Sequence, residues 1–338
     1  MMTAGTDSKA PSYAILVAGL VLAVLACLAG SVATGYAPLD LPAAIGDVLA
    51  GRQSLPALVL LELRLPRALL GLLVGFSLGL GGAAMQGLLR NPLAEPGVIG
   101  VSAAAALGAV LVFYSGVAGT VALALPLGGI AGAVLATLLL LALARRGAGT
   151  MTVILAGVAV SSAAGALTAL ALNLSPNPYA ALEIVFWLMG SLADRSLEHV
   201  WLVLPPMAVG WALILAGARA LDALTLGEDT AASLGFDLGR LRLQLIAGTA
   251  LAVGSAVAVT GAIAFVGLVV PHLLRPLVGH RPGRLLFVSG LGGAVLLLLA
   301  DIGLRLVRIQ PELKLGVVTA VIGAPFLFGL IWRLRRSA

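Results

Sequence analysis

The sequence predicts an all-α integral membrane protein with about ten transmembrane helices. Of its 338 residues, 61% are hydrophobic and only 10% are charged, whereas soluble domains contain about 50% apolar and about 25% charged residues. The apolar residues form continuous stretches of about 20, the length that a helix needs to cross a bilayer. This composition excludes a water-soluble globular enzyme and a disordered chain. The unbroken stretches also argue against an outer-membrane barrel, whose strands alternate in hydropathy.

Ten stretches are long and apolar enough to be transmembrane spans. They are residues 13–33, 65–89, 97–115, 118–144, 150–174, 198–218, 241–259, 262–279, 285–305 and 314–334. The first is too long for the apolar part of a signal peptide, so we expect an uncleaved helix there. Only Thr260-Gly261 separates the seventh span from the eighth. A shorter stretch, 180–193, cannot cross and is expected to be an interfacial or re-entrant helix.

The basic residues predict the orientation of the chain in the membrane. An even number of spans places both termini on one side, and most of the 20 basic residues fall on that side. The positive-inside rule therefore predicts cytoplasmic termini. The basic residues expected on the opposite side are Arg52, Arg64, Arg67, Arg195, Arg305, Arg308 and Lys314. No basic run is longer than two residues, which argues against nucleic-acid binding.

Two polar segments interrupt the apolar pattern. Residues 90–97 contain two prolines and a glycine, so we expect one helix to end there and the next to begin. The longest polar insert is 219–242, on the cytoplasmic side of this topology. A connection of this length between packed helices usually has a function.

The motifs of common catalytic and metal sites are missing from the sequence. Neither lysine stands in a Gly-Lys-Ser/Thr loop, so we expect no nucleotide site, and there is no Gly-x-Ser-x-Gly motif. His199, His272 and His280 lack the spacing of metal ligands. Cys27 is the single cysteine, so no disulfide is expected. The sequence thus predicts a protein without a metal site or cofactor of its own.

Two other classes of function stay open at this point. An ion-coupled secondary transporter needs ionisable groups in mid-membrane, but most acidic residues, Asp301 included, fall in loops or at the ends of spans. A membrane-embedded enzyme could pair a serine with His272, but nothing marks any serine as activated. Dependence on an ATPase would separate the first class from an ATP-driven transporter.

Several motifs, in order along nearly the whole chain from about residue 60, resemble the FecCD-like permease family. The motifs are Arg64-Leu65-Pro66-Arg67, Gly71, Gly75, Gly79, Met85-Gln86, Asn91-Pro92-Leu93-Ala94-Glu95-Pro96, Trp187-Leu188-Met189-Gly190-Ser191, Leu226-Gly227-Glu228, Ala231, Leu234-Gly235, Gly261-Ala262-Ile263-Ala264-Phe265-Val266-Gly267-Leu268, Pro271-His272, Arg275, Ala300-Asp301, Arg305, Gly316-Val317-Val318-Thr319-Ala320 and Ile322-Gly323-Ala324-Pro325. This family comprises the membrane subunits of type II ABC importers. Two segments depart from its pattern: Lys314 replaces a usual proline, and Gly279-His280-Arg281 replaces an Asp-His-Arg turn.

The resemblance implies an assembly in the bacterial inner membrane. Residues 1–338 would form one permease domain that pairs with a second permease copy or a paralogue. Two cytoplasmic ABC ATPase subunits would bind ATP-Mg, and a periplasmic binding protein would deliver the substrate. The substrates of the family are iron chelates and cobalamin, and we expect an iron-siderophore first, haem second and cobalamin third.

The resemblance also implies a docking site for the binding protein. In the family, arginines at the positions of Arg64, Arg67 and Arg305 pair with glutamates of the binding protein. From the residues alone, the favoured interpretation of Arg64 and Arg67 is that they are interfacial anchors. Arg305 could instead bond Asp301, one turn earlier on the same helix. We expect docking ahead of these structural roles.

A coupling loop and a pathway wall complete the predicted sites. The resemblance makes residues 219–242 the loop that contacts the ATPase, with Gly227, Glu228, Ala231, Leu234 and Gly235 in its coupling helix. A short helix with acidic residues in its first turn is the simpler interpretation of the same residues. The wall of the pathway is expected to include 150–174, with Gly157, Ser161 and Ser162, and the last helix.

Overall fold

The structure, a computed structural model, describes residues 12–36, 38–121, 123–144, 150–175, 178–307, 309 and 311–337. Within these residues every regular element is a helix and no strand is present. Seven of the helices described there are long and apolar enough to cross a membrane. The predicted all-α membrane fold is therefore confirmed.

The long helices are connected by shorter ones along the chain. The α-helices are α1 (Tyr13–Ala33), α2 (Leu41–Leu49), α3 (Leu55–Leu58), α4 (Leu65–Leu88), α5 (Val101–Tyr114), α6 (Ala124–Ala144), α7 (Thr150–Asn173), α8 (Pro178–Leu188), α9 (Leu197–Ala216), α10 (Ala218–Leu224), α11 (Glu228–Ser233), α12 (Leu238–Thr260), α13 (Val266–Leu274), α14 (Pro282–Val307) and α15 (Leu315–Ser337). A π-helical segment, η1 (Val59–Arg64), joins α3 to α4, and the short 3-10 helices are η2 (Pro96–Ile99), η3 (Val117–Gly119) and η4 (Pro276–Val278).

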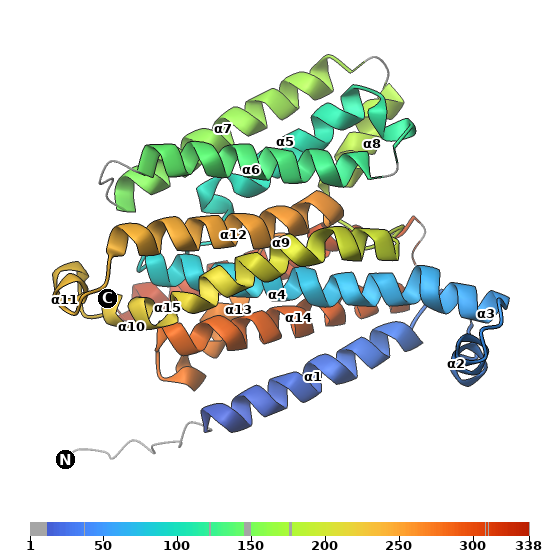
Figure 1. Cartoon of the computed structure of the whole chain (residues 1–338), viewed down its shortest axis with the longest axis horizontal. Helices are drawn as coiled ribbons and strands as arrows, with labels where there is room; N and C mark the ends of the chain where they lie inside the picture. The colour runs from blue at the N-terminus through green and yellow to red at the C-terminus, as the bar shows by residue number, and fades with distance from the viewer. Residues whose placement is uncertain are drawn as a thin grey trace.

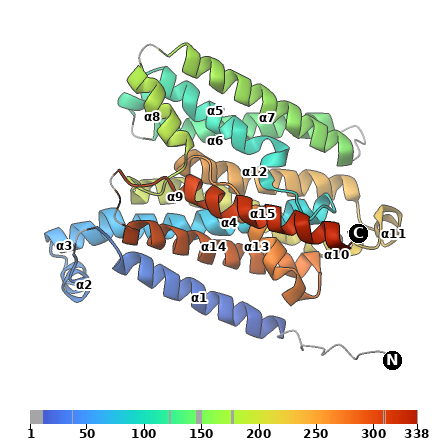
Figure 2. The same cartoon turned by 180° about the vertical axis from the view of Figure 1, so that it is seen from behind.

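The long helices lie side by side in one bundle. Figure 1 shows α1 along one side, α5, α6 and α7 along the other, and α4, α9, α12 and α14 between them. Figure 2 shows α15 on the face opposite to α9. We call the end that carries α11 the α11 end and the opposite end the α2 end. Helix α1 begins and α15 finishes at the α11 end, which agrees with an even number of passes.

Glycines bring the central helices α4 and α14 into backbone contact. A Cβ added to Gly75 would lie 2.5 Å from the carbonyl oxygen of Gly293, and one added to Gly79 would lie 2.0 Å from that of Ser289. No larger residue fits at these positions. The four-residue glycine spacing of α4 therefore serves close helix packing, as small residues do in membrane bundles.

The predicted spans agree with nine helices, namely α1, α4, α5, α6, α7, α9, α12, α14 and α15, to within six residues at each end. The prediction of a helical span over 262–279 was wrong. Residues 261–265 are not helical, and α13 has only nine residues, about 14 Å of helix. The segment still joins the two ends, because Gly261 meets Trp187 at the α2 end and His280 lies beside Thr225 at the α11 end.

Contacts with other parts of the protein hold the non-helical part of this crossing. The backbone N–H of Phe265, which precedes α13, donates a hydrogen bond of 2.9 Å to the carboxylate of Glu95. Gly261 has a φ of +73°, and a Cβ there would lie 2.1 Å from the carbonyl oxygen of Trp187. Irregular backbone is tolerated at membrane depth where protein groups satisfy it. The short helix predicted within 180–193 corresponds to α8. Its 11 residues are too few to cross a bilayer.

Candidate functional site

The three predicted docking arginines gather at the α2 end. Arg64 at the end of η1, Arg67 of α4 and Arg305 of α14 line one cavity of about 290 Å³. Arg195, from the segment after α8, lines the same cavity and was not predicted as part of the site. We call these four residues the arginine cluster. The π-helical segment η1 ends at Arg64, directly before α4, at the edge of this cavity.

Two members of the cluster bind the last turn of α1. The Arg64 guanidinium donates to the carbonyl oxygens of Val32 and Ala33, at 3.0 and 2.8 Å. Arg305 donates to the carbonyl oxygen of Ser31 at 2.8 Å and to its hydroxyl at 2.7 Å. The last carbonyls of a helix lack partners within the helix, and cations there also complement its dipole. Arg64 and Arg305 therefore cap α1, and both are buried.

The third predicted arginine is held by carboxylates. Arg67 lies 2.7 Å from Asp301 Oδ1, and it also pairs with Glu312. Asp301 pairs in turn with Arg305 at 2.7 Å, one turn later on α14, as the alternative interpretation of Arg305 expected. The side chain of Arg67 is 12% exposed and that of Glu312 is 22% exposed, whereas Asp301 and Arg305 are nearly inaccessible. Arg67 and Glu312 thus form the accessible part of this network. Docking stays a prediction.

The predicted coupling loop folds as the short helix α11 between two glycines. Gly227 has φ +109° and ψ 157°, a conformation that essentially only glycine adopts. Gly235 has φ +87°, and the N–H groups of Gly235 and Phe236 bind the carbonyl oxygens of Ala232 and Ala231. This is the Schellman pattern of helix termination. Two glycines therefore fix where α11 begins and ends.

The faces of α11 differ in exposure. Ala231 is fully buried, whereas Leu234 and the preceding Leu226 are exposed. Glu228 binds Arg242 of α12, with both carboxylate oxygens 2.9 Å from Nη2. Glu228 thus ties the loop to its own subunit. Leu226 and Leu234 are the exposed large apolar side chains of this loop, and they lie beside exposed polar residues such as Asp229 and Ser233. The coupling role stays a prediction.

The residues predicted for the pathway do not share one environment. Gly157 of α7 is buried, and a Cβ there would lie 2.2 Å from the carbonyl oxygen of Val98, so Gly157 packs against η2. The hydroxyl of Ser161 approaches the carbonyl oxygen of Gly97 at 3.4 Å, and Ser162 is exposed. Only the two serines therefore remain candidates for the wall of a pathway.

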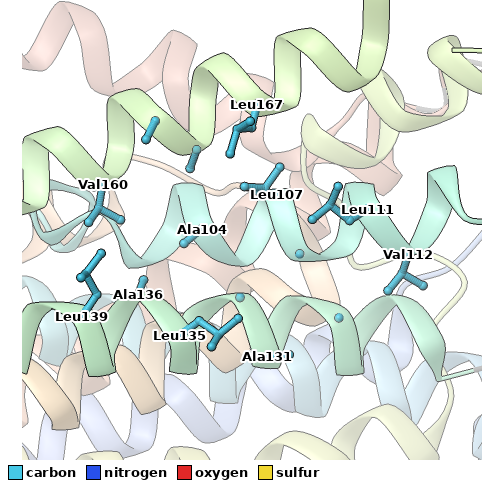
Figure 3. A pocket seen from close by; sticks show the side chains of 15 residues that line it. Ala104, Leu107, Leu111, Val112, Ala131, Leu135, Ala136, Leu139, Val160 and Leu167 are labelled. Atoms are coloured by element: carbon cyan, nitrogen blue, oxygen red, sulfur yellow. The ribbon is translucent and has the colours of Figure 1, made fainter. Parts of the chain in front are cut away.

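Three cavities lie near these residues. The first, of about 440 Å³, lies between α5, α6 and α7, and Leu107, Leu135 and Leu167 are among the residues that line it (Figure 3). Its lining is entirely alanine, glycine, leucine and valine, so it has no group that recognises a polar solute. The other two, of about 780 and 500 Å³, lie between the C-terminal part of α8 and α15. Both are lined by Met189 and Val317.

Two of the three histidines, His199 and His272, take structural places. His199 accepts the N–H of Ser196 and caps α9, and the His272 ring lies edge-on to Phe326. Among the described residues, no three His, Cys, Asp or Glu side chains come together as they would around a metal ion.

A bundle of long apolar helices, with a glycine-bounded loop at one end and a charged cavity at the other, is the fold of a multi-pass membrane protein. The chain belongs to the FecCD transport family, which matches residues 20–333. It is therefore a permease subunit of an ABC importer, a transport subunit of the bacterial inner membrane. ATPase and substrate-binding partners are general features of such importers.

Relatives of known function agree with this assignment. The vitamin B12 import system permease protein BtuC of Salmonella paratyphi A is 41% identical over 296 residues, which cover 87% of each chain. The ferric enterobactin transport system permease protein FepD of Escherichia coli is 40% identical and covers 98% of this chain and 99% of its own. A solved structure of an inward-facing metal-chelate type ABC transporter superposes with a TM-score of 0.84 at 31% identity, covering 95% of this chain and 100% of that one.

Proposed function

We propose that this chain forms, with a second permease copy or a paralogue, the pathway of an ATP-driven importer for an iron chelate. A ferric siderophore is the first choice of substrate, haem the second and cobalamin the third. The alignment with FepD, which covers 98% of the chain against 87% for BtuC, supports the first choice of substrate. The partners are two cytoplasmic ATPase subunits, which bind ATP-Mg, and a periplasmic binding protein.

The arginine cluster is the proposed docking site for carboxylates of the binding protein. Four arginines line one cavity at the α2 end, the periplasmic end if the termini are cytoplasmic. Exposed opposite charges orient a docking partner and accelerate its association more than they add affinity. Because Arg64 and Arg305 already cap α1, Arg67 and Arg195, which are both partly exposed, are the members that an incoming carboxylate reaches.

The α11 loop is the proposed contact with the ATPase. It lies at the end opposite to the arginine cluster, it is bounded by Gly227 and Gly235, and it exposes Leu226 and Leu234. A short helix that is anchored by the buried Ala231 and flanked by the exposed Leu226 and Leu234 transmits movement of the ATPase to α10 and α12, which flank it. Ser161, Ser162 and the exposed side of α15 are proposed to line the pathway.

The proposal is tested by uptake into proteoliposomes that contain this chain and its ATPase, with the binding protein outside and ATP inside. Labelled ferric siderophore, haem and cobalamin are offered in turn. We expect uptake of the ferric siderophore that requires both ATP and the binding protein. Uptake of another ligand would overturn the substrate order, and uptake without the ATPase would favour an ion-coupled transporter.

A further inference from the structure

A second charged cavity lies at the α11 end. It has a volume of about 240 Å³, and three basic side chains line it: Arg90 after α4, Arg275 after α13 and His280 before α14. Thr225, which precedes the coupling loop, also lines it, and no aspartate or glutamate does. We call Arg90, Arg275 and His280 the basic pocket.

The positive charge of the basic pocket is not balanced within the chain. Among the described residues, none of its three members forms a salt bridge. Arg275 donates to the neutral amide oxygen of Gln86 at 2.5 Å, and the Gln86 amide nitrogen donates to backbone carbonyls of α13. This hydrogen bond fixes the position of the guanidinium, but the neutral amide does not balance its positive charge. Arg275 therefore keeps donors available for an anion.

Two of the basic residues stand in an unfavourable backbone conformation. Arg90 has φ +49° and His280 has φ +59°, in the left-handed region that favours glycine and asparagine. Arg90 occupies the position after α4 where a Schellman motif usually has glycine, since the N–H of Asn91 binds the carbonyl oxygen of Gln86. Strained residues gather at functional sites. Here two of them carry basic side chains into the same cavity.

The position of the basic pocket indicates which anion it meets. Thr225 lies three residues before Glu228, the first residue of α11. The pocket is built on the end of α4, which lies between α9 and α14 in the middle of the bundle (Figure 1). A lipid headgroup approaches from the rim of the bundle, whereas a soluble subunit covers its end. A protein carboxylate therefore fits the site better than a lipid phosphate.

We propose that the basic pocket receives an aspartate or glutamate side chain of the ATPase subunit that docks on the α11 loop. This inference rests on the proposed function, because it requires that partner. An arginine binds a carboxylate through two parallel N–H donors, which fixes orientation as well as position. The pocket thus adds a charged contact beside the apolar contact of Leu226 and Leu234.

The test uses the double variant Arg90→Gly with His280→Asn. Both replacements favour the left-handed backbone, so they remove charge without weakening the fold. The control is Arg284→Ala, which removes a positive charge at the same end from a side chain that lies over the Tyr13 ring, away from the pocket. The permease is reconstituted in nanodiscs, and association of the purified ATPase subunit is followed at low and high salt.

We expect the double variant to associate about tenfold more slowly than the parent at low salt, with a weaker salt dependence, because opposite charges steer encounter. Arg284→Ala should behave as the parent does. Equal association rates for the double variant and the parent would overturn this inference alone, whereas an ATPase that does not bind the parent would overturn the proposed function. If the double variant lost binding of phosphatidylglycerol but kept ATPase association, the site would be a lipid site and the inference would fall.

Discussion

The carboxylate of Asp301 on α14 lies 2.7 Å from the guanidinium of Arg67 on α4, although only 1% of the Asp301 side chain is exposed. The same carboxylate lies 2.7 Å from Arg305, which caps α1. One buried acid therefore holds together three helices that are far apart in the sequence. Taking these charges out of water is costly, and their mutual attraction must offset that cost.

Replacing Asp301 should destabilise the bundle strongly. In the variant Asp301→Asn, Arg67 and Arg305 remain buried with only Glu312 to balance them. Removing one partner of a buried pair costs about 3–5 kcal/mol, because a charge is left uncompensated. The control is Asp47→Asn, which breaks the exposed pair with Arg52 and should cost about 1 kcal/mol or less. Thermal unfolding in detergent measures both, and equal melting temperatures would contradict the expectation.

Replacing Glu95 should loosen the non-helical segment 261–265, which precedes α13. Glu95 accepts the N–H of Phe265 at 2.9 Å, and leaving such a buried donor without a partner costs about 1–3 kcal/mol. We expect Glu95→Ala to increase hydrogen exchange at residues 262–268, whereas Glu95→Gln keeps an acceptor oxygen and should change exchange little. Equal protection in the two variants would show that the carboxylate does not hold this segment.

Hydropathy predicted the helices well because a continuous apolar stretch has few other solutions in a bilayer. It could not predict the break at 261–265, since Ala262, Ile263 and Ala264 are as apolar as a helix requires. The break depends on distant groups instead: the carbonyl oxygen of Trp187 against Gly261, and the carboxylate of Glu95 on Phe265. Local sequence does not contain these contacts.

The sequence predicted the members of the candidate docking site better than it predicted their contacts. The resemblance selected Arg64, Arg67 and Arg305, and the structure gathers them in one cavity. It did not indicate that two of them cap α1, because their acceptors are backbone carbonyls, which any sequence has. Arg195 and Glu312 were missed for a related reason: each lies in a loop whose path is decided by the packing of α8 and α15. The position of Arg195 next to Asp194 was the only local signal.

Replacing Gly235 should disturb the end of α11. Nothing lies within 4 Å of a Cβ added there, so the cost comes from φ +87° alone, about 1 kcal/mol for a residue with a side chain. We expect Gly235→Ala to fray α11 and to lower transport per ATP hydrolysed. The control is Gly303→Ala, which also meets open space but lies inside the helix α14, where alanine is favourable. Unchanged coupling in Gly235→Ala would count against the coupling role of this turn.

Replacing Glu312 tests the docking proposal without removing an arginine. Exchanging Arg64 for glutamate would set a carboxylate against the carbonyls of Val32 and Ala33, so loss of function there would report on folding. Glu312 is different, because its side chain is 22% exposed and pairs with Arg67, the less exposed of the two. We infer that Glu312 competes with the carboxylates of the binding protein.

The variant Glu312→Gln keeps the shape of the side chain and removes its charge, so Arg67 becomes available. We expect the binding protein to associate about 3–10 times more tightly, since the incoming carboxylate no longer displaces an internal one. The control is Glu183→Gln, which removes an exposed carboxylate from the neighbouring cavity between α8 and α15. A general gain in electrostatic attraction would appear in both variants, whereas competition for Arg67 appears in Glu312→Gln alone. Equal affinities of the two variants, measured by titration of the binding protein onto the reconstituted permease, would therefore remove Arg67 from the docking site.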